Sequence, residues 1–308
     1  MAKRHAYKLQ VLCKEHIMTE PTLLKRKRSV VRRILVAADL SKKDENIFSR
    51  ALEIARKHEA QLYIMHVHHA VRVHQSSAEY KEEKFKEISA HITSLLCGCG
   101  YTEDVNVITR VVDGGRIYDR INSYALDKNV DLIIMGASQL NVYVPDFVLT
   151  TVEKVIACAN CPVLIVSQSV KSGYQSIAVY ASKCFDLMRT LDILPLAPKG
   201  LGGHIHHYTQ PIPSRVGVLS GLRHKFELRA KAKENRFIRA LYSRNYSCVQ
   251  YEKVALGILL SSLLSLNLDV LSLTLPKNSL CRQDPDKGVR GLLSEPDCDI
   301  LILGSAAG

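Results

Sequence analysis

The sequence contains no long hydrophobic run. No stretch reaches the 18 or more apolar residues that a membrane-spanning helix needs, and the strongest candidate, residues 254–266, is short and interrupted by three serines. That segment is better interpreted as a buried helix. The N-terminal residues also lack an apolar core followed by a small-residue cleavage site, which argues against a secretory signal. We therefore expect no membrane span.

The sequence also lacks a disulfide framework and a catalytic constellation. Its nine cysteines are odd in number and irregularly spaced, as is common in the reducing cytoplasm, where we place the protein. Cys158 and Cys161 have the spacing of a redox pair, but they follow a helix and precede a strand, which is the wrong context for one. No serine sits in a nucleophile elbow. We therefore expect a protein that is not an enzyme.

The net charge of +12 comes from two local segments. Residues 1–33 carry a net charge of +8 and residues 223–244 a net charge of +6, which leaves the remainder close to neutral. Such segments can attract phosphate polymers or anionic lipid. The alternative is that residues 1–33 are simply a solvated tail and residues 223–244 a solvated helix face. No aromatic-rich recognition strand accompanies them, so a nucleic-acid partner is not expected.

The first half of the chain alternates short apolar strands with amphipathic helices. With 308 residues the chain can form two domains of ordinary size. Continuously apolar strands joined by helices predict a parallel α/β sheet that is covered on both faces. The predicted strands are 33–39, 60–67, 105–111, 131–135 and 163–166, and the predicted helices are 44–58, 78–97, 115–128 and 150–159.

The second half repeats this pattern in a weaker form. Residues 33–39 match 176–182, residues 63–70 match 203–210, and residues 131–138 match 299–306. Three matches in the same order indicate a tandem duplication. On this alignment 268–275 is the third strand of the repeat and 299–304 the fourth. We therefore expect the repeat to lack its fifth strand, with helices over 223–242 and 252–266.

The segment from Asp131 to Val166 resembles the C-terminal half of a universal stress protein domain. In that family a loop holds nucleotide phosphates through the pattern glycine, two residues, glycine, nine residues, glycine, then serine or threonine. Gly136 and Thr150 fit this pattern, whereas Gln139 and Leu149 stand where glycines are expected. The resemblance implies two tandem doubly wound, Rossmann-like α/β domains. These would span 31–168 and 175–308, the second incomplete, after a basic extension over 1–30.

The resemblance also implies an adenine-nucleotide site. The residues that carry over are Asp39, Val67, Met135, Gly136, Ser138, Thr150 and Thr151. A phosphate loop turns several backbone N–H groups toward one anion, which favours glycine. Gln139 and Leu149 add side chains to that loop, and Asp146 would repel phosphate. The sequence therefore predicts a degraded site and no cofactor, with ATP as the possible ligand.

Histidines end two equivalent strands, as His66, His68 and His69 and as His204, His206 and His207. Residues two apart share a strand face, so His66 with His68 could converge on a metal. The alternative is polar residues at the end of a strand. We expect no metal site.

The favoured function is that of a non-catalytic stress-response or regulatory protein. It would act through dimerisation and binding of an unidentified protein partner. The alternative is an ATP-binding switch with slow hydrolysis. We expect the subunit or domain contact on the strand 163–166, because an apolar edge strand invites pairing. With the fifth strand of the repeat missing, a second chain could be recruited to that edge.

Overall fold

The computed structural model describes eleven segments of the chain, which together have an α/β fold. Their strands form one mixed sheet. The basic extension 1–30 and the basic segment 223–244 lie outside these described residues, as do most of the helices predicted in the second half. None of the described helices is long and apolar enough to cross a membrane. The described residues are 31–41, 44–68, 78–137, 149–167, 173–181, 184–196, 204–209, 248–253, 267–275, 292–293 and 296–304.

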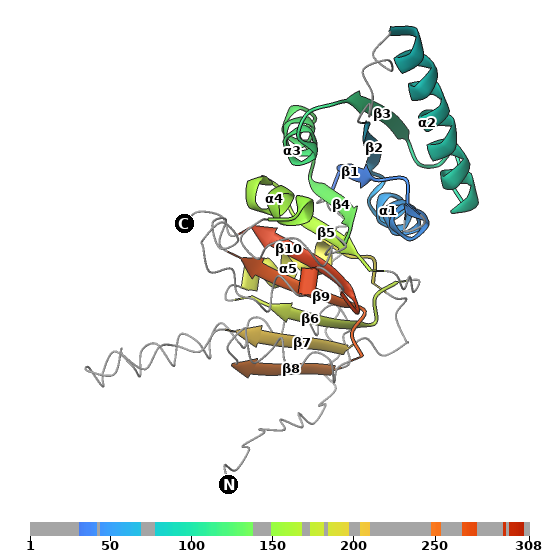
Figure 1. Cartoon of the computed structure of the whole chain (residues 1–308). Helices are drawn as coiled ribbons and strands as arrows, with labels where there is room; N and C mark the ends of the chain where they lie inside the picture. The colour runs from blue at the N-terminus through green and yellow to red at the C-terminus, as the bar shows by residue number, and fades with distance from the viewer. Residues whose placement is uncertain are drawn as a thin grey trace, which may run out of the picture.

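The sheet has ten strands in the order β3-β2-β1-β4-β5-β10-β9-β6-β7-β8 (Figure 1). Its first five strands are parallel to one another and come from the first half of the chain. The predicted elements of this half are all present, with ends shifted by no more than two residues. They are β1 Arg33–Ala38, α1 Asp44–His58, β2 Gln61–His68, α2 Ala78–Gly98, β3 Val107–Asp113, α3 Ile117–Asp127, β4 Leu132–Gly136, α4 Thr151–Cys158 and β5 Val163–Val166.

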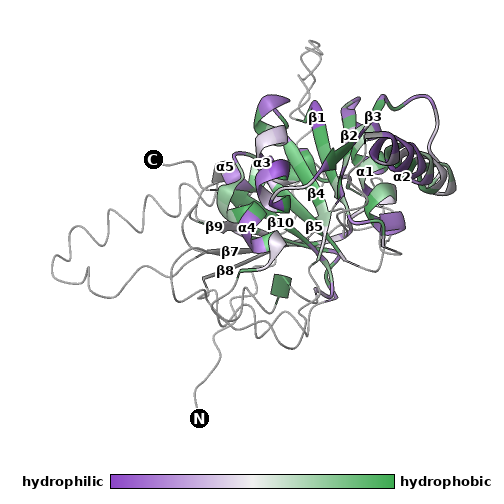
Figure 2. Ribbon diagram, turned by 45° about the horizontal axis from the view of Figure 1, so that its top comes forward, coloured by the Kyte–Doolittle hydropathy of each residue, from purple (hydrophilic) through white to green (hydrophobic). Residues whose placement is uncertain are grey.

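Burial explains why the central strands are apolar throughout. Side chains of β1, β4 and β5 are buried on both faces of the sheet, as parallel strands between two helix layers must be. Helices α1 and α2 pack together on one face, and α3 and α4 pack together on the other. Figure 2 shows that the strands inside are apolar and that the helix surfaces outside are polar.

The second half supplies the other five strands in the same order. They are β6 Ser176–Tyr180, β7 His204–Thr209, β8 Cys248–Lys253, β9 Val270–Leu275 and β10 Asp299–Gly304, and α5 spans Cys184–Ile193. Strand β6 lies between β7 and β9, as β1 lies between β2 and β4. Thus β9 takes the fourth position of the repeat and β10 the fifth.

Two expectations about the repeat are therefore wrong. Residues 268–275 are not its third strand, because β8 occupies that place; β8 also includes Glu252, where a helix was predicted to begin. The repeat does not lack a fifth strand, because β10 pairs with β9 and with β5. The match of 131–138 to 299–306 compared strands at different positions, since short apolar strands followed by small residues look alike in sequence.

A pair of aspartates shows the true equivalence. The Asp131 carboxylate accepts hydrogen bonds from the backbone N–H groups of Arg32 and Arg33, at 2.8 and 3.0 Å. The Asp269 carboxylate accepts from Gln175 and Ser176, both at 2.8 Å. Each aspartate precedes the fourth strand of its half and fixes the start of the first. Asp131 is thus the counterpart of Asp269 and not of Asp299.

Strand β10 closes the edge that β5 would otherwise expose. The two run antiparallel, with Leu301 opposite Leu164, and with Ile300 and Ile302 opposite Ile165 and Val163. The two halves therefore meet in the way two identical subunits would, about an approximate two-fold axis. The expected contact on the strand 163–166 is present, but it is made within the chain. The recruitment of a second chain to this edge is not supported, because the edge is already paired.

A buried polar network joins the halves beside this strand pair. Arg50 of α1 is 2% exposed, and its Nε lies 3.1 Å from Oδ2 of Asp299 at the start of β10. The Tyr174 hydroxyl donates to the same carboxylate, and the Arg50 guanidinium lies 4.1 Å from the centre of the Tyr174 ring. Ser167 N donates to Asp299 Oδ1 at 2.8 Å. Helix α1 of the first half is thus fixed to β10 of the second.

Candidate functional site

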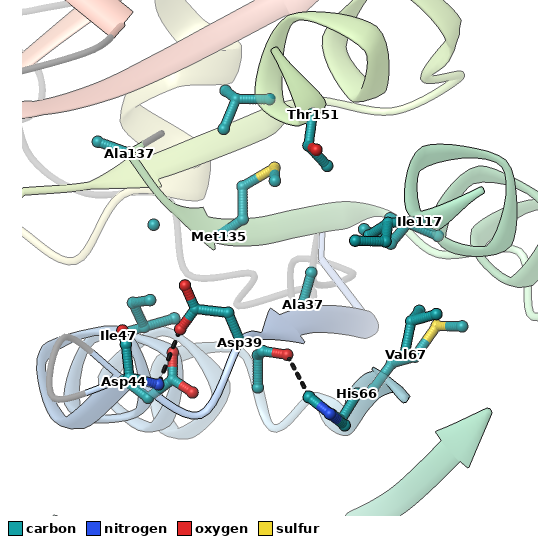
Figure 3. Close-up of a pocket in the computed structure, with 16 residues that line it drawn as sticks. Ala37, Asp39, Asp44, Ile47, His66, Val67, Ile117, Met135, Ala137 and Thr151 are labelled. Atoms are coloured by element: carbon teal, nitrogen blue, oxygen red, sulfur yellow. Dashed lines mark hydrogen bonds between the residues drawn. The ribbon is translucent and has the colours of Figure 1, made fainter. Parts of the chain in front are cut away.

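A cavity lies at the carboxyl ends of the strands of the first half, where the strand order reverses between β1 and β4 (Figure 3). Open α/β sheets characteristically bind ligands at this point, because the crossovers leave in opposite directions and open a gap. The cavity has a volume of about 440 Å³, within the range for small-molecule sites. Its lining residues are Ala37, Ala38, Asp39, Ser41, Asp44, Ile47, Met65, His66, Val67, Ile117, Ile121, Met135, Gly136, Ala137, Thr151 and Val152.

The cavity brings together most of the residues predicted for the nucleotide site. Asp39 follows β1, Val67 lies near the end of β2, and Met135 and Gly136 end β4. Thr151 enters from the first turn of α4. Ser138 and Gln139 fall outside the described residues. The apolar and polar residues predicted for the nucleoside pocket therefore line one cavity. Residues 138–148, which connect β4 to α4, are not described.

Thr150, which the resemblance implies for the nucleotide site, caps a helix in this structure. It is the N-cap of α4: its hydroxyl accepts a hydrogen bond from Glu153 N at 3.3 Å, and Glu153 Oε2 accepts from Thr150 N at 2.6 Å. This capping box satisfies two backbone donors that the first turn would otherwise leave unpaired. Thr150 is not among the residues that line the cavity.

The walls of the cavity are mainly apolar and closely packed around Gly136. A methyl group at Gly136 would lie 3.0 Å from Cδ1 of Ile47, so a larger residue there would push that side chain. Ile117 of α3 and Val67 of β2 add apolar surface on the side away from Ile47 (Figure 3). Such walls suit the flat faces of an aromatic ring.

The polar end of the cavity is a turn that links β1 to α1. Leu40 has a positive φ of 63°, which is unfavourable for a residue with a side chain. Asp44 Oδ2 accepts from Leu40 N at 2.7 Å, and Asp39 Oδ1 accepts from Ser41 N at 2.9 Å. Asp44 N in turn donates to Ser41 O at 3.0 Å. These three bonds hold the turn, and with it both carboxyl groups, against the cavity.

The environment of Asp44 raises its pKa to about 7. Burial is the main cause, because the side chain is fully buried and its ionised form loses hydration. The negative charge of Asp39 adds to this, and backbone N–H groups only partly oppose it. Asp44 was not among the predicted site residues. The signal that could have identified it was an acid five residues after Asp39, in the first turn of the next helix.

The histidines do not form a metal centre in the part of the chain described. His66 Nδ1 lies 3.0 Å from the carbonyl oxygen of Ala38, and the His66 and His68 ring centroids are 6.4 Å apart. Among the described residues no group of three or more His, Cys, Asp or Glu side chains could hold a metal ion. The side chains of His69, His204 and His207 are outside that description.

The Cys158–Cys161 spacing does not produce a reactive pair. Burial raises the pKa of Cys161 to about 12, so it remains a thiol at neutral pH. Cys298 holds the same place before β10 that Cys161 holds before β5, and burial also raises its pKa to about 12. The two cysteines mark equivalent positions in the repeat, in CPVLIV and CDILIL.

Comparison with known proteins gives a consistent result for the first half. The model of the Universal stress protein family matches residues 31–167. A Staphylococcus epidermidis protein named "Putative universal stress protein" is 34% identical over 139 residues, which cover 43% of this chain and 82% of the relative. A Staphylococcus aureus protein of the same name is 33% identical over 139 residues, with the same coverage.

Solved structures resemble both halves. A universal stress protein from Archaeoglobus fulgidus aligns with a TM-score of 0.63 and 13% identity, over 89% of this chain and 97% of that one. A functionally unknown protein from Pseudomonas aeruginosa aligns with a TM-score of 0.60 and 15% identity, over 90% and 94% of the two chains. At these identities the likeness concerns the fold.

The fold and the family match together define a tandem α/β protein with a cavity at the switch point of its first half. The chain belongs to the universal stress protein family.

Proposed function

We propose that the protein is a non-catalytic regulatory member of the family whose first half binds an adenine nucleoside without a strong hold on phosphate. The observation that carries the proposal is the cavity at the switch point, with Asp39, Val67 and Met135 around it. Its volume of about 440 Å³ suits a ligand of nucleoside size. Occupancy of the cavity would report a metabolic state to a protein partner.

The apolar walls support a base-binding role. Val67 and Ile117 can contact the faces of a purine, and the Asp39 carboxylate can accept a hydrogen bond from an amino or hydroxyl group. The polar groups around the cavity are mostly committed to holding the turn or to the backbone. This supports binding and not a reaction.

The sequence of the adjoining loop argues for weak phosphate binding. Gln139 and Leu149 replace two residues where glycine would let backbone N–H groups approach an anion. Thr150, which could otherwise contact a phosphate, caps α4. The Asp39 carboxylate adds negative charge at the other end of the cavity.

The protein would act as a single chain at the β5 edge, with β10 in the place of a second subunit. We place it in the cytoplasm: Cys97, Cys99, Cys158, Cys161 and Cys298, the five cysteines whose state the structure gives, are all free thiols, as a reducing compartment favours.

A reversion experiment tests the phosphate part of the proposal. Calorimetry at moderate salt would compare adenosine and ATP binding to the wild type and to the variant Gln139→Gly with Leu149→Gly. We expect the double variant to gain ATP affinity, by about tenfold or more, with little change for adenosine. A matched control is Gln139→Ala with Leu149→Ala, which shortens both side chains without giving the backbone the freedom of glycine.

Tight, salt-independent ATP binding by the wild type would favour the alternative, an ATP-binding switch with slow hydrolysis. If neither adenosine nor ATP binds to the wild type or to any variant, the proposed nucleoside site is contradicted.

A further inference from the structure

Two carboxyl groups meet at one end of the cavity. Asp39 leaves β1 and Asp44 begins α1, and the turn between them brings both side chains to the cavity lining (Figure 3). Asp39 is exposed, whereas Asp44 is fully buried. The pair therefore spans the boundary between the cavity and the protein interior.

Asp44 has one carboxyl oxygen in use and one without a donor. Oδ2 accepts from Leu40 N at 2.7 Å, but no donor among the described residues reaches the buried Oδ1. An ionised carboxylate with an unsatisfied buried oxygen is costly. A proton on Asp44 removes that cost, because the protonated group can donate to the neighbouring Asp39 carboxylate, a bond that itself favours the protonated form of Asp44.

The surroundings offer little compensation for two negative charges. From β2 the titratable group facing the cavity is His66, whose Nδ1 lies against the Ala38 carbonyl. Helices α3 and α4 and strand β4 contribute only uncharged side chains to the lining, and α1 contributes no cation among its lining residues. Lys42 and Lys43, within the turn, lie outside the described residues. Two ionised carboxylates would therefore repel each other across the turn.

We propose that Asp39 and Asp44 share one proton and that an uncharged nucleoside filling the cavity binds together with uptake of that proton from solvent. The proposal rests on the proposed function. A ligand in the cavity displaces water from the exposed Asp39, and this disfavours the doubly ionised pair more than the singly protonated one. By linkage, a ligand that favours the protonated pair must bind more tightly where that pair is populated. Asp44 is thereby a residue that makes binding sensitive to pH near neutrality.

The test measures adenosine affinity against pH by calorimetry, between about pH 6 and about pH 9, in two buffers with different protonation enthalpies. Adenosine is a suitable probe because it does not titrate in this range. We expect the wild type to lose affinity by roughly tenfold or more across the range, with uptake of about one proton per adenosine near pH 8. Asp44→Asn keeps the shape and a permanent donor but cannot titrate, so its affinity should not vary with pH.

Asp127→Asn is the matched control, because Asp127 is an exposed aspartate paired with Lys128 outside the cavity lining; it should behave as the wild type does. Carboxyl-carbon NMR of the wild type without ligand provides an independent readout, in which Asp44 should titrate near neutrality. Adenosine binding that is independent of pH, or a pH dependence retained in Asp44→Asn, would overturn this inference and leave the proposed function standing. Failure of adenosine to bind at any pH would overturn both.

Discussion

Removal of the Asp299 carboxylate should strongly destabilise the protein. Asp299→Ala takes from the buried Arg50 its partner at 3.1 Å and leaves the Tyr174 hydroxyl and the Ser167 N–H without their acceptor. Burial by itself lowers the pKa of Arg50, but Tyr174, Asp299 and Glu53 outweigh it and raise that pKa. An arginine side chain is not deprotonated in proteins, so the guanidinium stays charged in the variant.

The magnitude follows from the burial of the pair. Both side chains are 2% exposed, and removing one partner of such a buried pair costs about 3–5 kcal/mol, since the other charge is left uncompensated. Glu53 still pairs with Arg50 at 2.5 Å, so we expect the lower end, about 3 kcal/mol. Urea unfolding at pH 7, followed by circular dichroism, measures this loss.

The matched control is Asp104→Ala. The Arg56–Asp104 pair has the same 3.1 Å separation, but its side chains are 37% and 52% exposed. An exposed pair of this kind contributes little to stability, because both charges remain hydrated. In addition, Arg50→Met combined with Asp299→Leu should be more stable than Asp299→Ala, because the double change leaves no buried charge. Equal and small losses for Asp299→Ala and Asp104→Ala would refute the argument that this network holds the two halves together.

Three further predictions concern a cap, a titration and two thiols. Thr150→Ala removes the N-cap of α4 and should lower the free energy of unfolding by about 1 kcal/mol in urea titrations, whereas Thr150→Ser should retain it. The pKa of Asp44 rises from an ordinary value of 3.8 to about 7 on folding, so the folded state binds more protons between these values and stability should fall as pH rises from about 4 to about 7. Asp44→Asn should therefore be more stable than the wild type at pH 8, by at most about 4 kcal/mol, and an unchanged stability there would contradict the raised pKa. At pH 8 a thiol reagent should modify the exposed Cys158 quickly and the half-buried Cys161 and buried Cys298 about a thousandfold more slowly, as measured by mass spectrometry of the native protein, because their pKa of about 12 leaves little thiolate.

The fold of the first half was predictable because each of its signals is local. Continuous apolar runs such as residues 33–38 identify strands buried on both faces, and helix spacing identifies the elements between them. Four of the cavity residues, Asp39, Val67, Met135 and Gly136, were implied by the resemblance to the universal stress protein family. All four lie at or just after strand ends, and parallel strands deliver their last residues to one edge of the sheet.

The order of strands in the second half was not predictable in the same way. Residues 131–136, which include β4, and residues 299–304, which form β10, both consist of an aspartate, an apolar run and a glycine, yet the two strands occupy different positions. Position is decided by pairing with β5 and β9, which is long-range information. The cysteine that precedes each of β5 and β10 was a better indicator that these two strands are equivalent.

The role of Asp44 was missed for a related reason. An acid in the first turn of a helix is ordinarily explained by the helix dipole. Its burial against the cavity depends on the positive φ of Leu40 and on the bond from Leu40 N. Neither can be recognised from residue types alone.

The ratio of the adenosine and ATP dissociation constants of the wild type is the most direct test of the central claim, that the cavity holds a nucleoside while the altered loop contributes little to phosphate binding. Calorimetry at about 0.15 M salt, where non-specific attraction is screened beyond about 8 Å, gives both constants under one condition. We predict adenosine binding and an ATP constant within about tenfold of it. ATP binding that is tighter by several hundredfold or more would contradict the claim, because the loop would then supply the phosphate contacts that Gln139 and Leu149 are argued to remove.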